Sequence, residues 1–254
     1  MNAFEALAQR LADAAGAEIL KYWRQPIDVD DKADESPVTI ADREAERVMR
    51  ALIVQTFPDH GILGEEFGNE RLDARHVWVL DPVDGTRAFI TGKPSFGTLI
   101  GLWEGDRPLL GVIDQPVTRE RWLGLTGGKT TLNGKPVRVR PCDDLKKAAL
   151  YATGPEMFSG EDVNRFERLR KRVKLPRYGA DCYAYALLAT GFVDLVCEAN
   201  LKPYDYAAVV PVIEAAGGIV TDWQGQPLTL KSDGRMLAAG DRRLHAQALE
   251  VLNA

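Results

Sequence analysis

The stretch Val77-Trp78-Val79-Leu80-Asp81-Pro82-Val83-Asp84-Gly85-Thr86 carries the clearest structural and chemical signal in the chain. Residues 76–80 are mostly apolar and prone to β-structure, and the run halts at Asp81-Pro82, so we expect a buried strand that emerges into a loop. Pro82 fixes one backbone angle and Gly85 permits a tight bend, which lets the acids, the Thr86 hydroxyl and the Val83 carbonyl converge. Two acids cannot both be buried in their charged form without a cation, and hard oxygen ligands of this kind suit Mg²⁺.

The same pattern is also typical of an ordinary turn at the end of a strand, because Asp, Pro and Gly are common turn residues. Its surroundings favour the ligand interpretation. Gly64-Glu65-Glu66 follows a short apolar segment upstream, and Asp205 opens a predicted helix far downstream. Three acidic strand or helix ends could therefore meet at one point.

The first part of the chain combines two helices with a series of strands. Helical spacing of apolar residues predicts a first helix through residues 4–19, ending before Pro26, and Thr39 can cap a second helix at residues 42–57. The acidic run at residues 28–37 is expected to be a loop. A meander of strands with a closing hairpin turn is predicted farther on, at residues 98–103, 110–114, 121–126 and Asn133-Gly134.

After Pro141 strands and helices alternate. Strands are predicted at residues 148–153, 193–198 and 236–239, and helices at residues 161–172, 181–190, 205–216 and the C-terminus. Pro211 should kink the helix at residues 205–216 or remove one of its hydrogen bonds. We expect one compact unit with an α+β half at residues 1–140 and an α/β half at residues 141–254, and a site between the halves.

The composition, with 254 residues of which 45% are hydrophobic and 27% charged, is that of a globular chain with a sizeable core. A formal charge of −5 offers no basic surface for a nucleic acid, whereas a small phosphorylated ligand remains compatible if metal ions supply positive charge. No segment approaches the apolar length of a membrane span, and residues 4–23 are interrupted by charges, unlike a signal peptide. We therefore expect a cytoplasmic protein.

Neither the cysteines nor the histidines form a recognisable reactive motif. The three cysteines are widely spaced, which argues against a disulfide framework or a thiolate zinc site, and we expect buried free thiols. The three histidines are scattered along the sequence and are expected to be surface or packing residues.

Taken together, the acidic motifs and their order resemble the inositol monophosphatase family of metal-dependent phosphatases over nearly the whole chain. The matching segments are Gly64-Glu65-Glu66, residues 81–86, Tyr204-Asp205 and Gly217-Gly218. The resemblance implies a layered α/β fold of the sugar-phosphatase type and hydrolysis of a phosphate monoester with Mg²⁺. Residues 36–43, 86–92 and 179–185 look most like the histidinol-phosphate phosphatases of this family.

The resemblance also implies roles for individual residues. Metal ligands would be Glu65, Asp81, the Val83 carbonyl, Asp84 and Asp205. Thr86 and Asp42, with Glu65 in the catalytic set, would hold and deprotonate the attacking water, and the N–H groups of Gly85 and Thr86 would bind phosphate oxygens. Without the resemblance, Asp42 is better explained as an acid at a helix start that interacts with the helix dipole.

Two further acids, Asp181 and Glu198, are expected along the alcohol side of the pocket, where they favour a cationic substrate such as histidinol phosphate. Asp181 is equally well explained as an N-cap of the helix that contains Tyr185, and Lys202 is near enough in sequence to neutralise Glu198. The alternative substrates are an inositol monophosphate and 3′-phosphoadenosine 5′-phosphate. With histidinol phosphate as substrate, the pathway would be histidine biosynthesis.

Departures from the commoner family pattern at Ala88, Tyr204 and Glu214 remove no metal ligand, so they put the substrate in doubt and not the reaction. A catalytically silent relative would be expected to lack one of the acids or Thr86. A dinucleotide-binding oxidoreductase would need a G-x-G-x-x-G after the first strand, and none is present. The resemblance further implies a homodimer.

Overall fold

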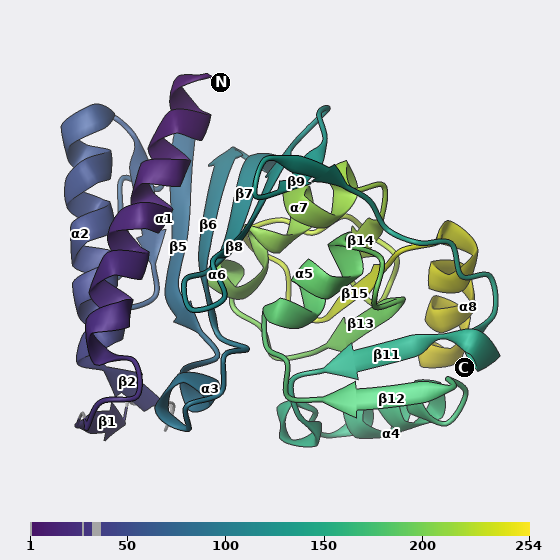
Figure 1. The fold of residues 1–254 in the computed structure, drawn as a ribbon. Helices are drawn as coiled ribbons and strands as arrows, with labels where there is room; N and C mark the ends of the chain where they lie inside the picture. The colour runs from purple at the N-terminus through teal and green to yellow at the C-terminus, as the bar shows by residue number, and fades with distance from the viewer. Residues whose placement is uncertain (1, 27, 32–36) are drawn as a thin grey trace.

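The computed structural model describes residues 2–26, 28–31 and 37–254, and it arranges them in five alternating layers of helices and sheets (Figure 1). Helices α1 (Ala3–Tyr22) and α2 (Ile40–Thr56) cover the outer face of the first sheet. Helices α5 (Tyr183–Ala189), α6 (Pro203–Tyr206) and α7 (Val209–Ala215) lie between the two sheets. Helices α4 (Glu161–Arg170) and α8 (Arg242–Leu252) cover the far face of the second sheet. The expected layered α/β fold is confirmed.

The first sheet has eight strands in the order β10-β9-β8-β7-β6-β5-β3-β4. Its strands are β3 (Gly61–Gly64), β4 (Asn69–Glu70), β5 (His76–Asp84), β6 (Gly97–Glu104), β7 (Arg107–Gln115), β8 (Glu120–Leu125), β9 (Thr130–Leu132) and β10 (Lys135–Val137). From β5 to β10 neighbouring strands are antiparallel, whereas β3 runs parallel to β5. Consequently the ends of β3 and β5 bring Glu65 and Asp81 to the same edge.

The second sheet has five strands in the order β12-β11-β13-β15-β14. They are β11 (Ala149–Ala152), β12 (Leu175–Tyr178), β13 (Leu195–Glu198), β14 (Ile219–Thr221) and β15 (Met236–Ala239). Side chains alternate between two cores: Val196 faces the helices between the sheets, and its neighbours Leu195 and Cys197 face α4 and α8. Glu198 ends β13 on the side of the inner helices.

Most predicted elements are confirmed within a few residues, including the Asn133-Gly134 turn, in which both residues have positive φ. Thr39 caps α2 as predicted, with Asp42 completing a capping box. Strand β12 was not predicted, because its short mixed sequence at a sheet edge has no alternating pattern. The division of the chain at about residue 140 stays a prediction.

Three details differ from the sequence expectations. Part of the predicted loop forms strands, since β1 (Val29–Asp31) pairs with β2 (Pro37–Thr39). Residues 32–36, with Ser36, lie outside the described residues. Strand β5 continues past Asp81 to Asp84 with a shift of register, because the β6 partner extends beside it. The single kinked helix at residues 205–216 is instead two helices, α6 and α7.

Pro211 accounts for the break between α6 and α7. It lacks an N–H group, so the carbonyl of Ala207, four residues earlier, has no helical donor. The Trp103 indole N–H from β6 donates to that carbonyl at 2.9 Å. The Ala207 carbonyl therefore keeps a hydrogen-bond donor despite the break, and this bond links the end of α6 to the first sheet.

Candidate active site

A cavity of about 280 Å³ lies where the end of β5 meets α5, α6 and the end of β13. Its lining contains most of the predicted site residues, from the phosphate-binding turn to the two substrate acids. They are Glu65, Asp84, Gly85, Thr86, Asp181, Glu198 and Asp205. A larger cavity, of about 510 Å³, lies between α1 and β7–β8 and contains none of them; its Arg121 is paired with Asp13 and Asp114 at 2.8 and 2.6 Å.

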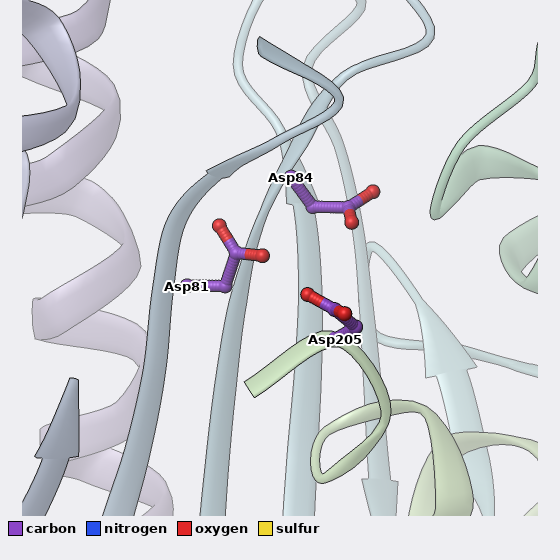
Figure 2. Close-up of side chains that lie close together, drawn as sticks. All are labelled: Asp81, Asp84 and Asp205. Carbon is purple, nitrogen blue, oxygen red and sulfur yellow. The ribbon is translucent and has the colours of Figure 1, made fainter. Parts of the chain in front are cut away.

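Asp81, Asp84 and Asp205 lie close together (Figure 2), and Asp84 and Asp205 also line the first cavity. Each offers a carboxylate oxygen, and these oxygens all lie within 4.8 Å of one another. Asp81 Oδ1 is buried and has no hydrogen-bond partner among the described residues. An unpartnered buried carboxylate oxygen beside two further acids fits a divalent cation, which prefers hard oxygen ligands.

The electrostatics of the cluster support this interpretation. Burial, followed by the charges of Glu65, Asp84 and Asp205, raises the pKa of Asp81 well above its usual range. Burial also raises the pKa of Asp84, with Asp181 and Asp205 adding to it, and burial with nearby Glu65 and Glu198 raises that of Asp205 to about 7. Clustered carboxylates repel one another in a medium of low dielectric, so a bound cation would offset a cost that the folded chain otherwise bears.

The turn that carries Glu65 is held by α2. Glu46, fully buried, accepts hydrogen bonds from the N–H groups of Glu66 and Phe67 at 2.7 and 3.1 Å and from Arg50 Nε at 2.7 Å. A Cβ on Gly64 would overlap Glu46 Oε1, so a side chain at this position would require the Glu46 carboxylate to shift. Sequence reasoning missed Glu46, although a Glu–Arg pair four residues apart on the buried face of α2 was a possible signal.

Asp42 and Thr86, the pair to which the resemblance assigns the attacking water, lie together although 44 residues separate them. The Thr86 hydroxyl lies 3.2 Å from Asp42 Oδ1 and 3.1 Å from the Val83 carbonyl. Asp42 Oδ2 accepts hydrogen bonds from the Thr39 hydroxyl and N–H at 2.6 and 2.9 Å. Asp42 is therefore both a helix-capping acid and the partner of Thr86, and burial raises its pKa.

Gly85 brings the turn at residues 85–86 against Asp181. Its φ of 82° lies in the left-handed region, and a Cβ there would lie 2.8 Å from Asp181 Cβ. It precedes α3 (Thr86–Ile90), whose first N–H groups have no intrahelical acceptor. Asp181 does not act as an N-cap: its Oδ2 accepts a hydrogen bond from the Ser95 hydroxyl at 2.9 Å, and α5 begins after Cys182 without a side-chain cap.

Glu198 also lines the cavity and is buried. Its Oε1 accepts the Thr153 N–H at 2.7 Å, and its Oε2 accepts the Tyr185 hydroxyl at 2.5 Å. Burial raises its pKa, whereas the two donors lower it. The Lys202 side chain forms no ion pair with Glu198 among the described residues, and the backbone N–H of Lys202 donates to Asp205 Oδ2 at 2.6 Å.

The histidines and cysteines take no part in lining this cavity, apart from Cys182. His60 and His76 are not scattered in space, because their rings lie 4.9 Å apart beside Phe4, far from the acids in β5. His245 is buried against Thr221. All three cysteines are free, and Cys182 and Cys197 are buried, while Cys142 is half-buried. Among the described residues, no helix is long and apolar enough to cross a bilayer.

Comparison with known proteins gives one consistent result. The model of the inositol monophosphatase family matches residues 1–254. The "Bifunctional phosphatase IMPL2, chloroplastic" of Arabidopsis thaliana is 51% identical over 99% of this chain and 75% of its own, and a "Histidinol-phosphatase" of Chlorobaculum parvum is 36% identical over 91% and 90%. A solved inositol monophosphatase from Zymomonas mobilis superimposes with a TM-score of 0.92 at 48% identity, and the match covers 100% of both chains.

Proposed function

The chain belongs to the inositol monophosphatase family of phosphatases, and from that premise we propose that it hydrolyses L-histidinol phosphate to L-histidinol and phosphate with Mg²⁺. The observation that carries the choice of substrate is the position of Asp181 and Glu198. Both line the cavity that also contains Asp84, Thr86 and Asp205, so two carboxylates face the alcohol part of a bound monoester. Histidinol phosphate presents an amino group and an imidazole there.

Glu65, Asp81, Asp84, Asp205 and the Val83 carbonyl are the groups proposed to hold the metal. A bound divalent cation would supply positive charge to the phosphoryl oxygens and lower the pKa of a water molecule. The unpartnered Asp81 Oδ1 and the raised pKa values of Asp81, Asp84 and Asp205 support this assignment. Mg²⁺ suits a site made of carboxylates and a carbonyl.

The proposed proton transfer uses the Thr86 hydroxyl and Asp42. The hydroxyl can accept a proton from the attacking water at Oγ1 while it gives its own to Asp42 Oδ1, 3.2 Å away. The two Thr39 donors keep Asp42 oriented for this step. Its raised pKa makes Asp42 a better proton acceptor than an exposed aspartate. The N–H groups of Gly85 and Thr86 are proposed to hold the phosphate oxygens.

The substrate proposal is tested by phosphate release from L-histidinol phosphate, myo-inositol 1-phosphate and 3′-phosphoadenosine 5′-phosphate, with Mg²⁺ and with a chelator. We expect kcat/KM to be highest for histidinol phosphate and activity to vanish with the chelator. Comparable turnover of all three substrates would contradict the proposal, and a preference for the inositol phosphate would assign that reaction instead.

Asp181→Asn isolates the charge at this position. Asparagine tolerates the left-handed backbone (φ 47°) and can keep the bond to Ser95, so the fold should be retained. Because a hydrogen bond to a charged group contributes about 1.5–3 kcal/mol, KM for histidinol phosphate should rise about 10- to 100-fold. KM for a neutral alcohol phosphate should stay within about twofold. Equal losses on both substrates would make Asp181 a structural residue.

The remaining expectations, a homodimer, a cytoplasmic location and a role in histidine biosynthesis, are part of the same proposal. A sedimentation experiment tests the homodimer, and the substrate assay tests the role in histidine biosynthesis.

A further inference from the structure

We propose that Tyr185 is a positioning residue that determines specificity: it fixes the Glu198 carboxylate on the cavity wall as an anionic partner for a cationic substrate. This inference rests on the proposed function, because it concerns the contact between Glu198 and the cationic part of histidinol phosphate. Tyr185 is proposed to hold Glu198 in the orientation that this contact needs, which a neutral alcohol phosphate would not use. Tyr185 itself is not proposed to take part in the phosphoryl transfer.

Three elements meet at Glu198. The carboxylate ends β13, the Tyr185 hydroxyl comes from α5, and the Thr153 N–H follows β11. The distances from Glu198 are 2.5 Å to the hydroxyl and 2.7 Å to the N–H, one on each carboxylate oxygen. Tyr185 is 3% exposed and Glu198 is 2% exposed, so neither bond has to compete with bulk water. The carboxylate is therefore held in one orientation.

The two donors also favour the charged form of Glu198. A carboxylate has about four acceptor positions, so one donor on each oxygen leaves the remaining lone pairs available to a ligand in the cavity. Burial and the neighbouring carboxylate raise the pKa of Tyr185, which keeps the phenol protonated and able only to donate to Glu198. Without this donor, burial would favour the neutral acid.

A neutral alcohol would not use this arrangement fully. Asp181 and Glu198 line the same cavity, and the charge of Asp181 adds to the factors that raise the pKa of Glu198. A hydroxyl group between two like charges leaves their repulsion in place, whereas an ammonium or imidazolium group offsets it. Two separately anchored acids, one held by Ser95 and one by Tyr185, thus suit a cation-bearing alcohol.

Helix α5 offers a matched control. The Tyr183 hydroxyl donates to Glu120 at 2.6 Å, so it makes the same kind of bond from the same helix, but neither residue lines the cavity. Tyr183→Phe therefore removes a tyrosine–glutamate hydrogen bond without touching the proposed site. A general effect of losing such a bond would appear in both variants, whereas a positioning effect would appear only in Tyr185→Phe.

The experiment measures kcat and KM for histidinol phosphate and for myo-inositol 1-phosphate with saturating Mg²⁺. The proteins compared are the wild type, Tyr185→Phe, Tyr183→Phe, Glu198→Gln and the double variant Tyr185→Phe/Glu198→Gln. We expect Tyr185→Phe to raise KM for histidinol phosphate about 5- to 20-fold, to change its kcat less than about twofold, and to leave KM for the inositol phosphate within about twofold. Tyr183→Phe should match the wild type. In the Glu198→Gln background, Tyr185→Phe should have no further effect on KM.

The outcomes separate the two proposals. A wild type without a preference for histidinol phosphate would overturn the proposed function and this inference with it. A preference that persists in Tyr185→Phe, or an equal rise of both KM values, would overturn only the role of Tyr185. If Tyr185→Phe fails to fold, Tyr185→His replaces it, because the histidine ring can retain a donor to Glu198. Selectivity for histidinol phosphate that is preserved in Tyr185→His but lost in Glu198→Gln would support the inference. Selectivity that is unchanged in Glu198→Gln would overturn it.

Discussion

At the residue scale, Asp81 shows how one side chain can suit a metal ion and weaken the fold. It is buried among Glu65, Asp84 and Asp205, and one of its oxygens has no partner among the described residues. Its pKa in the folded chain lies above that of the unfolded chain. The folded state therefore binds a proton more tightly, and the stability present at low pH is lost as pH rises toward neutrality.

Asp81→Asn should consequently separate stability from activity. In chelator at pH 7 the variant should melt about 3–8 °C above the wild type, because the substitution removes one of the repelling charges. Mg²⁺ should raise the melting temperature of the wild type but not that of the variant, and phosphatase activity should be lost. Thermal unfolding followed by circular dichroism gives the melting temperatures of both proteins with chelator and with Mg²⁺, and phosphate release gives the activity.

Acidification provides the internal control for this prediction. From pH 7 to pH 5 in chelator, the melting temperature of the wild type should move toward that of Asp81→Asn, since protonation removes the same charge. A variant that is less stable than the wild type at both pH values would show that the acid contributes to the fold without a metal.

At the element scale, a row of three glycines lets α7 and α6, which carries Asp205, pack closely against the first sheet. Gly101, Gly111 and Gly124 pair with one another across β6, β7 and β8, on the face that α6 and α7 cover. A Cβ on Gly111 would overlap the Ala208 carbonyl oxygen and lie 2.8 Å from Pro211 Cγ. The broken helix can therefore approach the sheet backbone directly, which places Asp205 beside the end of β5.

Gly111→Ala should push α6 and α7 away from the sheet. We expect a loss of about 1–3 kcal/mol in the free energy of unfolding, as in other overpacked cores, together with weaker activation by Mg²⁺ because Asp205 moves. Urea denaturation and the Mg²⁺ concentration for half-maximal activity measure the two effects.

Gly105→Asn is the matched control for this substitution. Gly105 lies in the turn between β6 and β7, has a φ of 57°, and has open space where a Cβ would lie, so asparagine should be tolerated. If Gly111→Ala and Gly105→Asn lose the same free energy of unfolding, the close packing of the broken helix against Gly111 is not the reason for the loss.

At the scale of the whole molecule, the two sheets share one core. The largest hydrophobic cluster contains Trp103 and Trp122 from the first sheet, the inner helices, and Val196 and Ala238 from the second sheet. Polar contacts cross the same layer, since the indole N–H of Trp122 donates to the Thr190 hydroxyl at 2.8 Å and the Thr130 hydroxyl donates to the Val212 carbonyl at 2.6 Å. Neither sheet can expose its inner face without losing this packing.

Unfolding should therefore be cooperative across both sheets. Four of the five tryptophans precede residue 140, so tryptophan fluorescence reports mainly on the first sheet, whereas far-UV circular dichroism reports on the whole chain. Urea transitions followed by the two signals in chelator should coincide. Two separate midpoints would show that the halves unfold independently and that the shared core contributes little.

The acidic motifs and most helices and strands could be predicted from the sequence, and seven of the residues that line the cavity were predicted from those motifs and the family resemblance. The motifs and elements depend on local chemistry: Pro82 and Gly85 define a turn, periodic apolar residues define helices and strands, and acids buried in their charged form require a cation. Asp181 is the instructive case, because its residue type and position suited both an N-cap and a substrate contact. Only its bond to Ser95 decided against the cap.

Other features depend on segments that are distant in the chain, and no local pattern encodes them. The Glu46 bonds to the Glu65 turn, the Tyr185 and Thr153 donors on Glu198, and the Trp103 bond to the Ala207 carbonyl each join residues that fold together only once the layers have packed. Local sequence thus specified which chemical groups are present and on which elements they lie. Tertiary packing decided which groups touch, because hydrogen bonds and close backbone approach depend on ångström distances between those elements.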